Sequence, residues 1–454
     1  MGVLPLAPGS PYHPGPCDPD DHQCVDGLSC QRNPHTGAYT CHNANADDGG
    51  LVVAFHATDF CVRTDLAHGW IGTHAECHVR APNACLASSP NDGFVQVNDV
   101  THQPDLGGEN PTEDNTMSFY NEDDLAFYYA LAETFAINDR YFRSVLGPTF
   151  PNRAYLMAAT ACGHLTSGEA RVHRARPLSA FYQPITGTIF DRLDQGHVSW
   201  ANYFSDVPQG LSFRNPVTDP HFQPMQAFFA AAQAGTLPAV VFVDAATGVF
   251  HPAAETDEHP RSDLRAGQHF VAQVVSAVRN GPNWPDAMIF ITYDEHGGFY
   301  DHVAPPAAPQ GGALTPDGIA PGQCADASNP PTSEAPGGGR HCTASAAMEA
   351  RFCPGFTATV AFLARCATFN QLGFRVPFLA VSPFAKPHYV SHTVGDHTPL
   401  LALIERRFLN DQHLTRRDAH ADTLEDLFDF NGPPSLNAPV WPSLAPAPRI
   451  PCAP

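Results

Sequence analysis

Two acidic residues followed by two glycines form the stretch of this sequence that is most typical of a reactive site. Asp294 and Glu295 come directly after the apolar run 287–293, and Gly297 and Gly298 follow them. Adjacent carboxylates repel each other, so a divalent cation is a natural compensating partner. The glycines allow a tight turn or a close approach of a ligand to the backbone. Two solvated acids in a turn are the ordinary alternative, but the apolar run and the glycines favour a site.

A threonine between two prolines is the second candidate. Pro148 and Pro151 restrict the backbone around Thr149 and would hold its hydroxyl in one direction, while Arg153 carries a planar fork suited to phosphate oxygens. Taken alone, a threonine in a proline-rich turn is more often structural than nucleophilic. This stretch gains chemical meaning only if the fold brings it to the carboxylates.

The strands that would position these residues are indicated by three apolar runs. Residues 237–243, 287–293 and 376–381 are each apolar on both faces. Strands of this kind lie inside a parallel sheet that is covered by helices. Ligands of such sheets bind at the carboxyl ends of the strands, which is where the Asp-Glu pair falls.

Amphipathic helices alternate with these runs. The spacing of apolar residues predicts one helix from Asp123 onward and another over Ser262–Arg279. After the third run, Thr398 is predicted to cap a helix that has Pro399 at its first position. Strands alternating with amphipathic helices predict an α/β sandwich with a mostly parallel central sheet.

The charge of the chain excludes some partners. The sequence has 454 residues, of which 46 are acidic and 24 basic, giving a net charge of -22. So little cationic surface disfavours binding to a nucleic-acid backbone. The 24 histidines will make the charge change steeply between about pH 7 and pH 5. No apolar run approaches the length needed to span a bilayer.

The cysteines and prolines indicate how the chain is organised. Seven of the thirteen cysteines lie before residue 90, which favours an exported, oxidised protein over a reduced one with buried thiols. No signal segment opens the sequence, so export is signalled elsewhere or the beginning is missing. Residues 1–50 are predicted to be a Cys/Pro/Gly-rich loop segment of the main domain, with disulfides preferred to a zinc knuckle because no C-x-x-C pair occurs there. A surface insertion is predicted at 304–350, and a proline-rich tail at 431–454.

Five motifs, in their order along the chain, resemble the bacterial phosphoesterase family of non-haemolytic phospholipases C and acid phosphatases. That family belongs to the alkaline-phosphatase-like superfamily. The motifs are Thr149-Phe150-Pro151-Asn152-Arg153, Glu258-His259-Pro260, the stretch from Tyr293 to His302, Arg375-Val376-Pro377 and Asp396-His397-Thr398. The resemblance runs from Asp65 to Phe430 and implies one alkaline-phosphatase-like domain over residues 51–430, with disulfide-bearing loop insertions.

The resemblance implies a metal-activated nucleophile. Thr149 matches a hydroxyl nucleophile that is also a metal ligand, and Asp294 and Glu295 match two carboxylates on the same divalent ion, which could be calcium, magnesium, manganese or zinc. Hydrolysis of a phosphoric ester would then pass through a phosphothreonine. The substrate would be a small phosphate ester or a phospholipid headgroup. The sequence does not separate a phosphomonoester from a phosphodiester, nor does it indicate an oligomeric state.

Histidines complete the site that the resemblance implies. His68 matches a histidine that faces the phosphate, while His259 and His397 match histidines expected to act on the substrate or the leaving group. Three more motif residues are expected to bind substrate: Asn152, Arg153 and His302. For Asn152 and His302, holding their loops in shape is an equal alternative.

The sequence departs from the family at one point. Family members begin with a strand that leads into Glu-Asn-Arg-Ser-Phe-Asp, whose first two residues complete the metal site, and no such segment precedes His68. Glu109-Asn110 lies after His68 in a polar loop and does not replace it. The chain as written is therefore expected to be a poor enzyme. The rival hypothesis is a truncated or inactive member that serves as a binding or structural module.

Overall fold

The computed structural model of the protein describes residues 113–161, 186–250, 255–260, 262–308 and 371–437, together with shorter stretches between 29 and 98 and isolated positions elsewhere. Most of the predicted insertion at 304–350 and of the tail at 431–454 lies outside the described residues. None of the described helices is long and apolar enough to cross a membrane.

Short strands precede the main body of the chain. Of the predicted loop segment 1–50, the described residues pair as two antiparallel hairpins, and the register of the first places Cys30 opposite Cys41. The elements of this part are β1 (Ser29–Arg32), β2 (Tyr39–His42), β3 (Ala44–Asp47), β4 (Gly50–Val53), β5 (Phe55–His56), α1 (Trp70–Cys77), α2 (Phe94–Asn98), η3 (Glu113–Met117) and β6 (Ser118–Phe119). A disulfide joins Cys77 to Cys85, and Cys61 is also disulfide-bonded, in agreement with an oxidised amino-terminal part.

Two sheets form the centre of the molecule. One has the order β10-β8-β9 and is parallel throughout; the other has the order β11-β12-β7-β13. Their strands are β7 (Ala136–Asn138), β8 (Trp200–Phe204), β9 (Phe222–Pro224), β10 (Val240–Asp244), β11 (Ile289–Thr292), β12 (Phe378–Val381) and β13 (Tyr389–Ser391). Among the described strands, β10 and β11 each pair on one side only, and most of their residues are half-buried.

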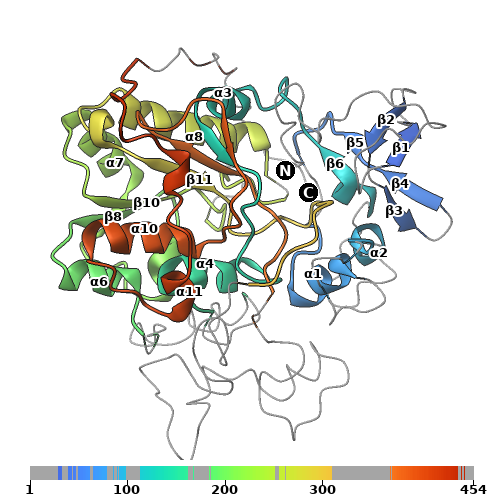
Figure 1. Ribbon diagram of the computed structural model, residues 1–454, viewed down its shortest axis with the longest axis horizontal. Helices are drawn as coiled ribbons and strands as arrows, with labels where there is room; N and C mark the ends of the chain where they lie inside the picture. The colour runs from blue at the N-terminus through green and yellow to red at the C-terminus, as the bar shows by residue number, and fades with distance from the viewer. Residues whose placement is uncertain are drawn as a thin grey trace, which may run out of the picture.

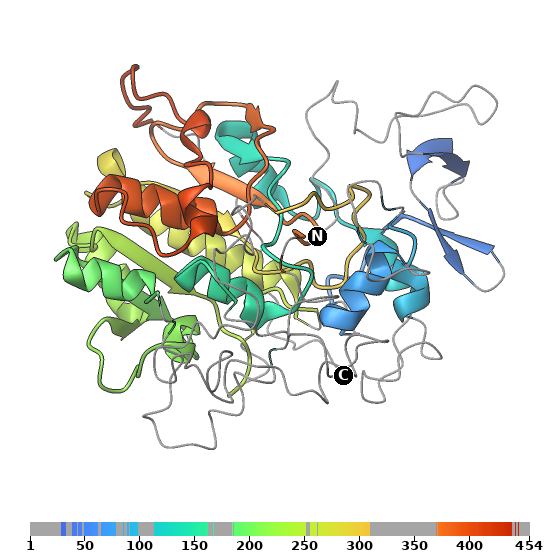
Figure 2. The ribbon, with the colours of Figure 1, turned by 60° about the horizontal axis from the view of Figure 1, so that its bottom comes forward.

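Helices cover the sheets on both faces (Figures 1 and 2). The helices and 3-10 turns are α3 (Ala126–Thr134), α4 (Thr149–Ala158), α6 (Ile189–Gln195), η5 (Gln209–Ser212), α7 (Met225–Ala234), α8 (Leu264–Arg279), η7 (Trp284–Asp286), α10 (Thr398–Phe408), α11 (Arg416–Ala419) and η8 (Glu425–Leu427).

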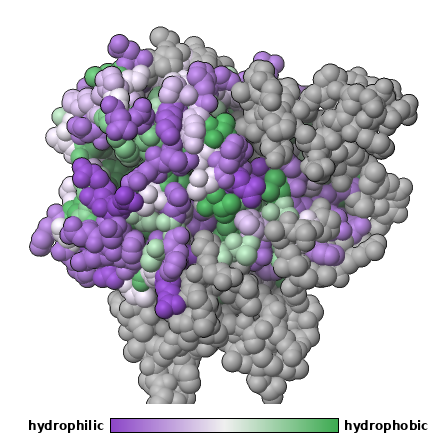
Figure 3. Space-filling view, viewed as in Figure 1, coloured by the Kyte–Doolittle hydropathy of each residue, from purple (hydrophilic) through white to green (hydrophobic). Residues whose placement is uncertain are grey.

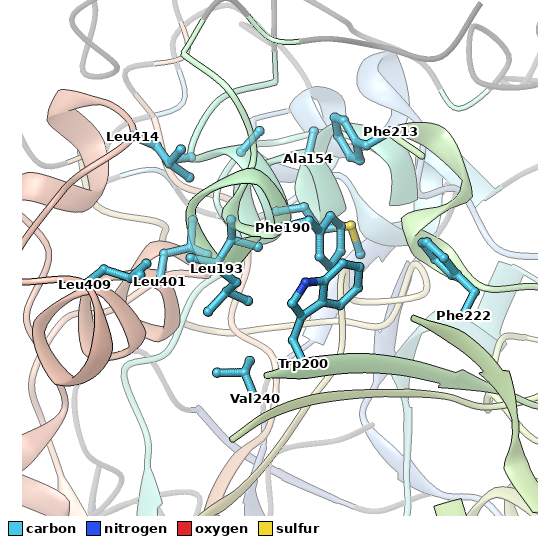
Figure 4. Packing of buried hydrophobic residues seen from close by; sticks show 14 of the residues in the cluster. Ala154, Phe190, Leu193, Trp200, Phe213, Phe222, Val240, Leu401, Leu409 and Leu414 are labelled. Carbon is cyan, nitrogen blue, oxygen red and sulfur yellow. The ribbon is translucent and has the colours of Figure 1, made fainter. Parts of the chain in front are cut away.

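Alternate residues of β8 show how the layers are separated. Trp200 packs among α4, α6 and α10 on one face, as Figure 4 shows, whereas Ala201 and Tyr203 pack among α3, α7 and α8 on the other. Because successive side chains of a strand point to opposite faces, this alternation defines a sandwich of helix, sheet and helix. The outer face seen in Figure 3 is mostly hydrophilic over these helices, with smaller hydrophobic areas toward the middle.

Two expectations from the sequence need correction. The α/β sandwich is confirmed, but the sheet that leads to Asp294 is mixed: β11 pairs with β12, and β12 with β7, in antiparallel register. Apolar runs indicate burial but carry no information on strand direction. At α10, the cap is His397 rather than Thr398, because Asp396 accepts a hydrogen bond from the Thr398 N–H and draws that residue into the first turn.

Candidate active site

The two carboxylates lie at the carboxyl end of β11. Glu295 is only 7% exposed, and its described hydrogen bonds and ion pairs all use Oε2, so Oε1 is free to bind a cation. Burial opposes ionisation of Glu295, but its interactions with His68, His296 and Arg143 outweigh burial and hold the pKa of Glu295 below its usual value. Glu295 is therefore a carboxylate at neutral pH.

The amino-terminal turn of α4 presents Thr149. Pro148 precedes the helix in extended conformation, so Thr149 is the first helical residue and lies where backbone N–H groups have no helical acceptor. Asn152 is fully buried: its Oδ1 accepts from Val145 N at 3.1 Å, and its Nδ2 donates to Gly147 O at 2.9 Å. In this structure Asn152 thus holds the loop before Thr149 in shape, and its contact with substrate stays a prediction.

Arg153 joins α4 to the carboxylates. Its Nε donates to Asp294 Oδ2 at 2.9 Å, and its NH1 lies 3.8 Å from Asp244 Oδ1. Although burial works against the charge, these two carboxylates raise the pKa of Arg153 above its usual value. Since residues four apart in a helix share a face, Arg153 places the Thr149 face of α4 beside the end of β11.

The two glycines after Glu295 bring two further loops to the site. Both have left-handed backbone, with φ of +64° at Gly297 and +81° at Gly298. A Cβ at Gly298 would overlap the side chain of Leu66, and one at Gly297 would lie 3.2 Å from Pro260 Cγ. The loops that carry His68 and His259 can therefore pack closely against the turn after the carboxylates.

His68 and His259 form a cluster with Asp65. Each imidazole donates its Nδ1–H to a backbone carbonyl, His68 to Leu66 O at 2.7 Å and His259 to Pro260 O at 2.9 Å. Each Nε2 is thereby left as the second, reactive nitrogen. Asp65 Oδ1 lies 4.0 Å from the Nε2 of His259, and the rings of the two histidines meet edge to face. Burial lowers the pKa of His259, but the surrounding carboxylates, led by Asp65, raise it above its usual value.

His397 lies behind the carboxylates. It is 1% exposed; its Nε2–H donates to Asp294 O at 2.9 Å, and its Nδ1 accepts from the Tyr141 hydroxyl at 3.2 Å. Burial lowers the pKa of His397, so the ring is neutral and both nitrogens are engaged. This position suits a residue that orients Asp294.

A buried charged network lies behind Glu295. His296 donates through Nε2 to Glu76 Oε2 at 2.9 Å and accepts at Nδ1 from Arg143 NH1 at 2.8 Å. Burial lowers the pKa of Arg143 to about 10, which leaves it charged at neutral pH. Together with the bond from Gly297 N to Glu295 Oε2, this network fixes the direction of the Glu295 side chain.

His302 is the last residue of the motif that begins at Tyr293, and it lies near Arg375. Asp301, the preceding residue, accepts from Arg375 NH2 at 2.7 Å and from its backbone N at 3.0 Å. Burial first, and then the charge of Arg375, lowers the pKa of His302 to about 4. His302 is therefore neutral at physiological pH, and its predicted contact with substrate stays a prediction.

By residue type, the predicted donors at the end of β11 would suit a divalent cation. Thr149, Asp294 and Glu295 would supply three oxygen donors to it, and oxygen donors suit hard cations. A second group, Asp65, His68 and His259, has ligand atoms within 4.8 Å of one another. These are nitrogen and oxygen donors that also suit zinc.

Several residues of the site were not predicted from the sequence. Asp65, Asp244 and the pair Glu76 and Arg143 were not predicted. A signal existed for Asp244, because it ends the strand 240–244 just as Asp294 follows the strand 289–292. The contact between Glu76 and His296 joins residues 220 positions apart and leaves no local pattern.

Comparisons with known proteins identify the family of the chain. Residues 50–409 match the model of the phosphoesterase family. A non-specific phospholipase C of Arabidopsis thaliana is 29% identical over 73% of this chain and 57% of its own length. Phospholipase C B of Mycobacterium tuberculosis is 29% identical over 87% of this chain and 70% of its own length, and the non-hemolytic phospholipase C of Burkholderia pseudomallei is 30% identical over 72% and 47%.

Similarity to solved structures is weak. The murine ectonucleotide pyrophosphatase/phosphodiesterase 5 gives a TM-score of 0.33 at 11% identity and covers 67% of this chain and 95% of its own. A phosphonate monoester hydrolase from Silicibacter pomeroyi gives 0.32 at 11% identity over 67% and 72%. The chain spans little more than half the length of several of its plant relatives. The family match covers most of the chain, and the protein belongs to the phosphoesterase family.

Proposed function

We propose that this protein is a metal-dependent hydrolase of phosphoric esters that uses Thr149 as its nucleophile. The contact between α4 and the end of β11 carries the proposal, because Arg153 Nε donates to Asp294 Oδ2 at 2.9 Å. This contact brings the threonine motif to the carboxylate motif across 141 residues of sequence, as the shared chemistry requires. A divalent cation held by Thr149, Asp294 and Glu295 would favour the deprotonated hydroxyl and stabilise charge on phosphoryl oxygens.

The remaining residues divide the work of positioning and proton transfer. The hydroxyl of Thr149 attacks phosphorus, and the N-terminus of α4 together with Arg153 stabilises the phosphoryl oxygens. His259, whose pKa is raised by its carboxylate neighbours, donates a proton to the leaving oxygen, and His68 faces the phosphate. Water then cleaves the phosphothreonine, which still carries the headgroup alcohol on its phosphate when the substrate is a diester. We assign His397 to positioning rather than to proton donation, since both of its ring nitrogens are engaged.

The names of the relatives favour a phospholipase C-like phosphodiesterase over an acid phosphatase. Relatives from a plant and from two bacteria are all called phospholipases C. The substrate in this proposal is a phospholipid headgroup ester. We also infer that the protein is exported, because the disulfide between Cys77 and Cys85 is stable in an oxidising compartment.

A substrate screen with matched variants tests the proposal. The chain is assayed with p-nitrophenyl phosphate, p-nitrophenylphosphorylcholine and phosphatidylcholine vesicles, after removal of metal and after return of magnesium, calcium, manganese or zinc. Thr149→Ala should lower kcat/KM by on the order of 10³ or more. The control, Thr218→Ala, changes an exposed threonine in a surface turn and should leave the rate unchanged.

Trapping the intermediate separates this mechanism from direct attack by water. Acid-quenched reactions should contain a phosphorylated peptide that includes Thr149. If Thr149→Ala hydrolyses these esters at the rate of the unchanged chain, the nucleophile is wrong. If neither the chain nor its metal-loaded forms hydrolyse any of them, the hydrolase function is wrong, and the binding-module hypothesis replaces it.

A further inference from the structure

The turn between α10 and α11 gathers three side chains that could bind a metal, away from the active site. Glu405 lies in the last turn of α10, His413 in the following turn and Asp418 in α11, and one ligand atom from each lies within 4.8 Å of the others. Figure 1 shows α10 and α11 side by side at one side of the molecule. Glu405 follows His397 by eight residues. Because a helix rises about 1.5 Å per residue, about 12 Å along α10 separates this cluster from His397, which contacts Asp294 in the active site.

Two of the three side chains are completely buried. Glu405 and Asp418 are both 0% exposed. Within the described part of the chain, neither carboxylate forms an ion pair with an arginine or lysine: the guanidinium of Arg417, next to Asp418, is directed to Asp396 instead. Two carboxylates taken out of water without a cation are strongly destabilising, so this cluster requires a positive charge.

The hydrogen bonds show where that charge is needed. Asp418 is already held by the backbone, since it accepts from Leu414 N at 2.7 Å and from Thr415 N at 2.8 Å. Glu405 Oε2 lies 2.9 Å from His413 Nδ1. Oε1 of the same Glu405 is buried and accepts no hydrogen bond from a donor among the described residues, while the carboxyl group of Asp418 lies within hydrogen-bonding reach of Glu405. A buried oxygen of this kind, beside a second carboxylate and an imidazole, points to a ligand.

We propose that Glu405, His413 and Asp418 bind one divalent transition-metal ion, such as zinc, which fastens the end of α10 to α11. Two carboxylates and an imidazole are the donor types that zinc takes in proteins. The side chain of His413 is 29% exposed, so water can complete the coordination.

The role of this ion is structural. Its ligands span only fourteen residues, counted from Glu405 to Asp418, and enclose the turn that places Leu409 and Leu414 in the core shown in Figure 4. The same turn precedes Arg417, whose bonds to Asp396 hold the start of α10. The ion therefore fixes a loop that supports the site without contacting substrate.

A proton on Glu405 is the competing source of positive charge. Burial first, and then the neighbouring Asp418, raises the pKa of Glu405 to about 10, so without a metal the group would be protonated at neutral pH. Glu405→Gln separates the two cases, because the amide resembles a protonated carboxyl in shape and charge but is a poor zinc ligand. A second variant, His413→Ala, removes a ligand whose side chain is partly exposed, so this variant carries less risk of misfolding than a change at a fully buried residue.

The test uses the purified chain, zinc alone as the probe, and four variants. After chelation and dialysis, zinc binding is measured by elemental analysis, and thermal unfolding is followed with and without zinc. Glu405→Gln and His413→Ala should each bind one equivalent less than the unchanged chain and should lose part of the zinc-dependent rise in melting temperature. The control His420→Ala changes an exposed histidine two residues after Asp418 and should bind zinc as the unchanged chain does.

The variant Asp294→Asn distinguishes zinc bound at the active site from zinc bound at the Glu405 cluster. Asp294→Asn should retain the one equivalent of zinc that Glu405→Gln loses. The proposal is wrong if Glu405→Gln and His413→Ala bind as much zinc as the unchanged chain. It is also wrong if zinc raises the melting temperature of these variants as much as it raises that of the unchanged chain. In either case a proton neutralises the cluster. Loss of phosphoesterase activity in every form would overturn the proposed function but not this site.

Discussion

Replacing Arg417 by methionine would remove one half of a buried ion pair that holds the start of α10. Arg417 is 0% exposed; its Nε and NH2 donate to Asp396 Oδ2 at 3.0 and 2.7 Å, and NH2 also donates to Ser144 O at 2.9 Å. Asp396 is 2% exposed and, apart from this pair, accepts from Thr398. Although burial opposes ionisation of Asp396, Arg417 holds its pKa below the usual value.

The expected cost follows from the charge that the substitution leaves behind. Methionine keeps most of the volume of arginine, so little of the effect comes from a cavity. Breaking a buried pair from one side typically costs about 3–5 kcal/mol, because the remaining ion is buried without a partner. We expect Arg417→Met to lower the free energy of unfolding by that amount. The phosphoesterase rate should also fall, since Asp396 precedes His397, which donates to Asp294 O.

Urea unfolding followed by tryptophan fluorescence measures this effect. Arg407→Met, which changes an exposed arginine of α10, is the control and should stay within about 0.5 kcal/mol of the unchanged chain. Adding Asp396→Asn to Arg417→Met removes the stranded charge and should recover part of the loss, which a double-mutant cycle quantifies. A loss below about 1 kcal/mol for Arg417→Met would refute the reasoning, because it would show that the pair contributes no more than an exposed one.

Three further predictions address the disulfide between Cys77 and Cys85, the buried Glu258 beside His259, and the binding of phosphoryl oxygens by Arg153. Replacing both Cys77 and Cys85 by serine should cost about 2–3 kcal/mol of stability, because the bridge closes a short loop, and thiol titration of the denatured chain should find fewer than thirteen thiols. Burial raises the pKa of Glu258 to about 7, so the native state binds this proton more tightly than the unfolded state. The free energy of unfolding should therefore fall as pH rises from about 4.5 through 7, and Glu258→Gln should flatten that slope in urea titrations. Arg153→Lys keeps the charge but loses the planar guanidinium that donates to Asp294, so kcat/KM should fall about 100-fold. An unchanged kcat/KM would show that the guanidinium of Arg153 does not bind the phosphoryl oxygens.

The sequence predicted those parts of the fold that local patterns determine. The run 287–293 contains β11, and the expected helix 262–279 is α8 to within two residues at its start, since Asp263 caps it. Direction and neighbours of the strands depend on contacts that a single segment does not encode, so the antiparallel pairing of β11 with β12 could not be read from either run. The cap of α10 lies one residue before the predicted position, because the Thr398 N–H donates to the side chain of Asp396.

The site was predictable only where its residues fall into motifs. The carboxylates, Thr149 and the histidines came from the motifs and the family resemblance. The groups that hold these residues in place act across long sequence separations: Arg143 meets His296 over 153 residues, and Tyr141 meets His397 over 256. Such pairs have no periodicity or fixed spacing, and only the folded chain reveals them.

The single-sided pairing of β10 and β11 sets how fast their amide hydrogens exchange with solvent. Strand β8 lies between β10 and β9 and has bonded neighbours on both sides, whereas β10 and β11 each have one described neighbour. Backbone N–H groups on an unpaired edge exchange through small local openings, while groups paired on both sides need a larger unfolding event. Alternate amides of β10 and β11 should therefore exchange orders of magnitude faster than those of β8. Both strands end at carboxylates that Arg153 contacts, so any strand that pairs with these edges would slow exchange there and hold Asp244 and Asp294 more rigidly.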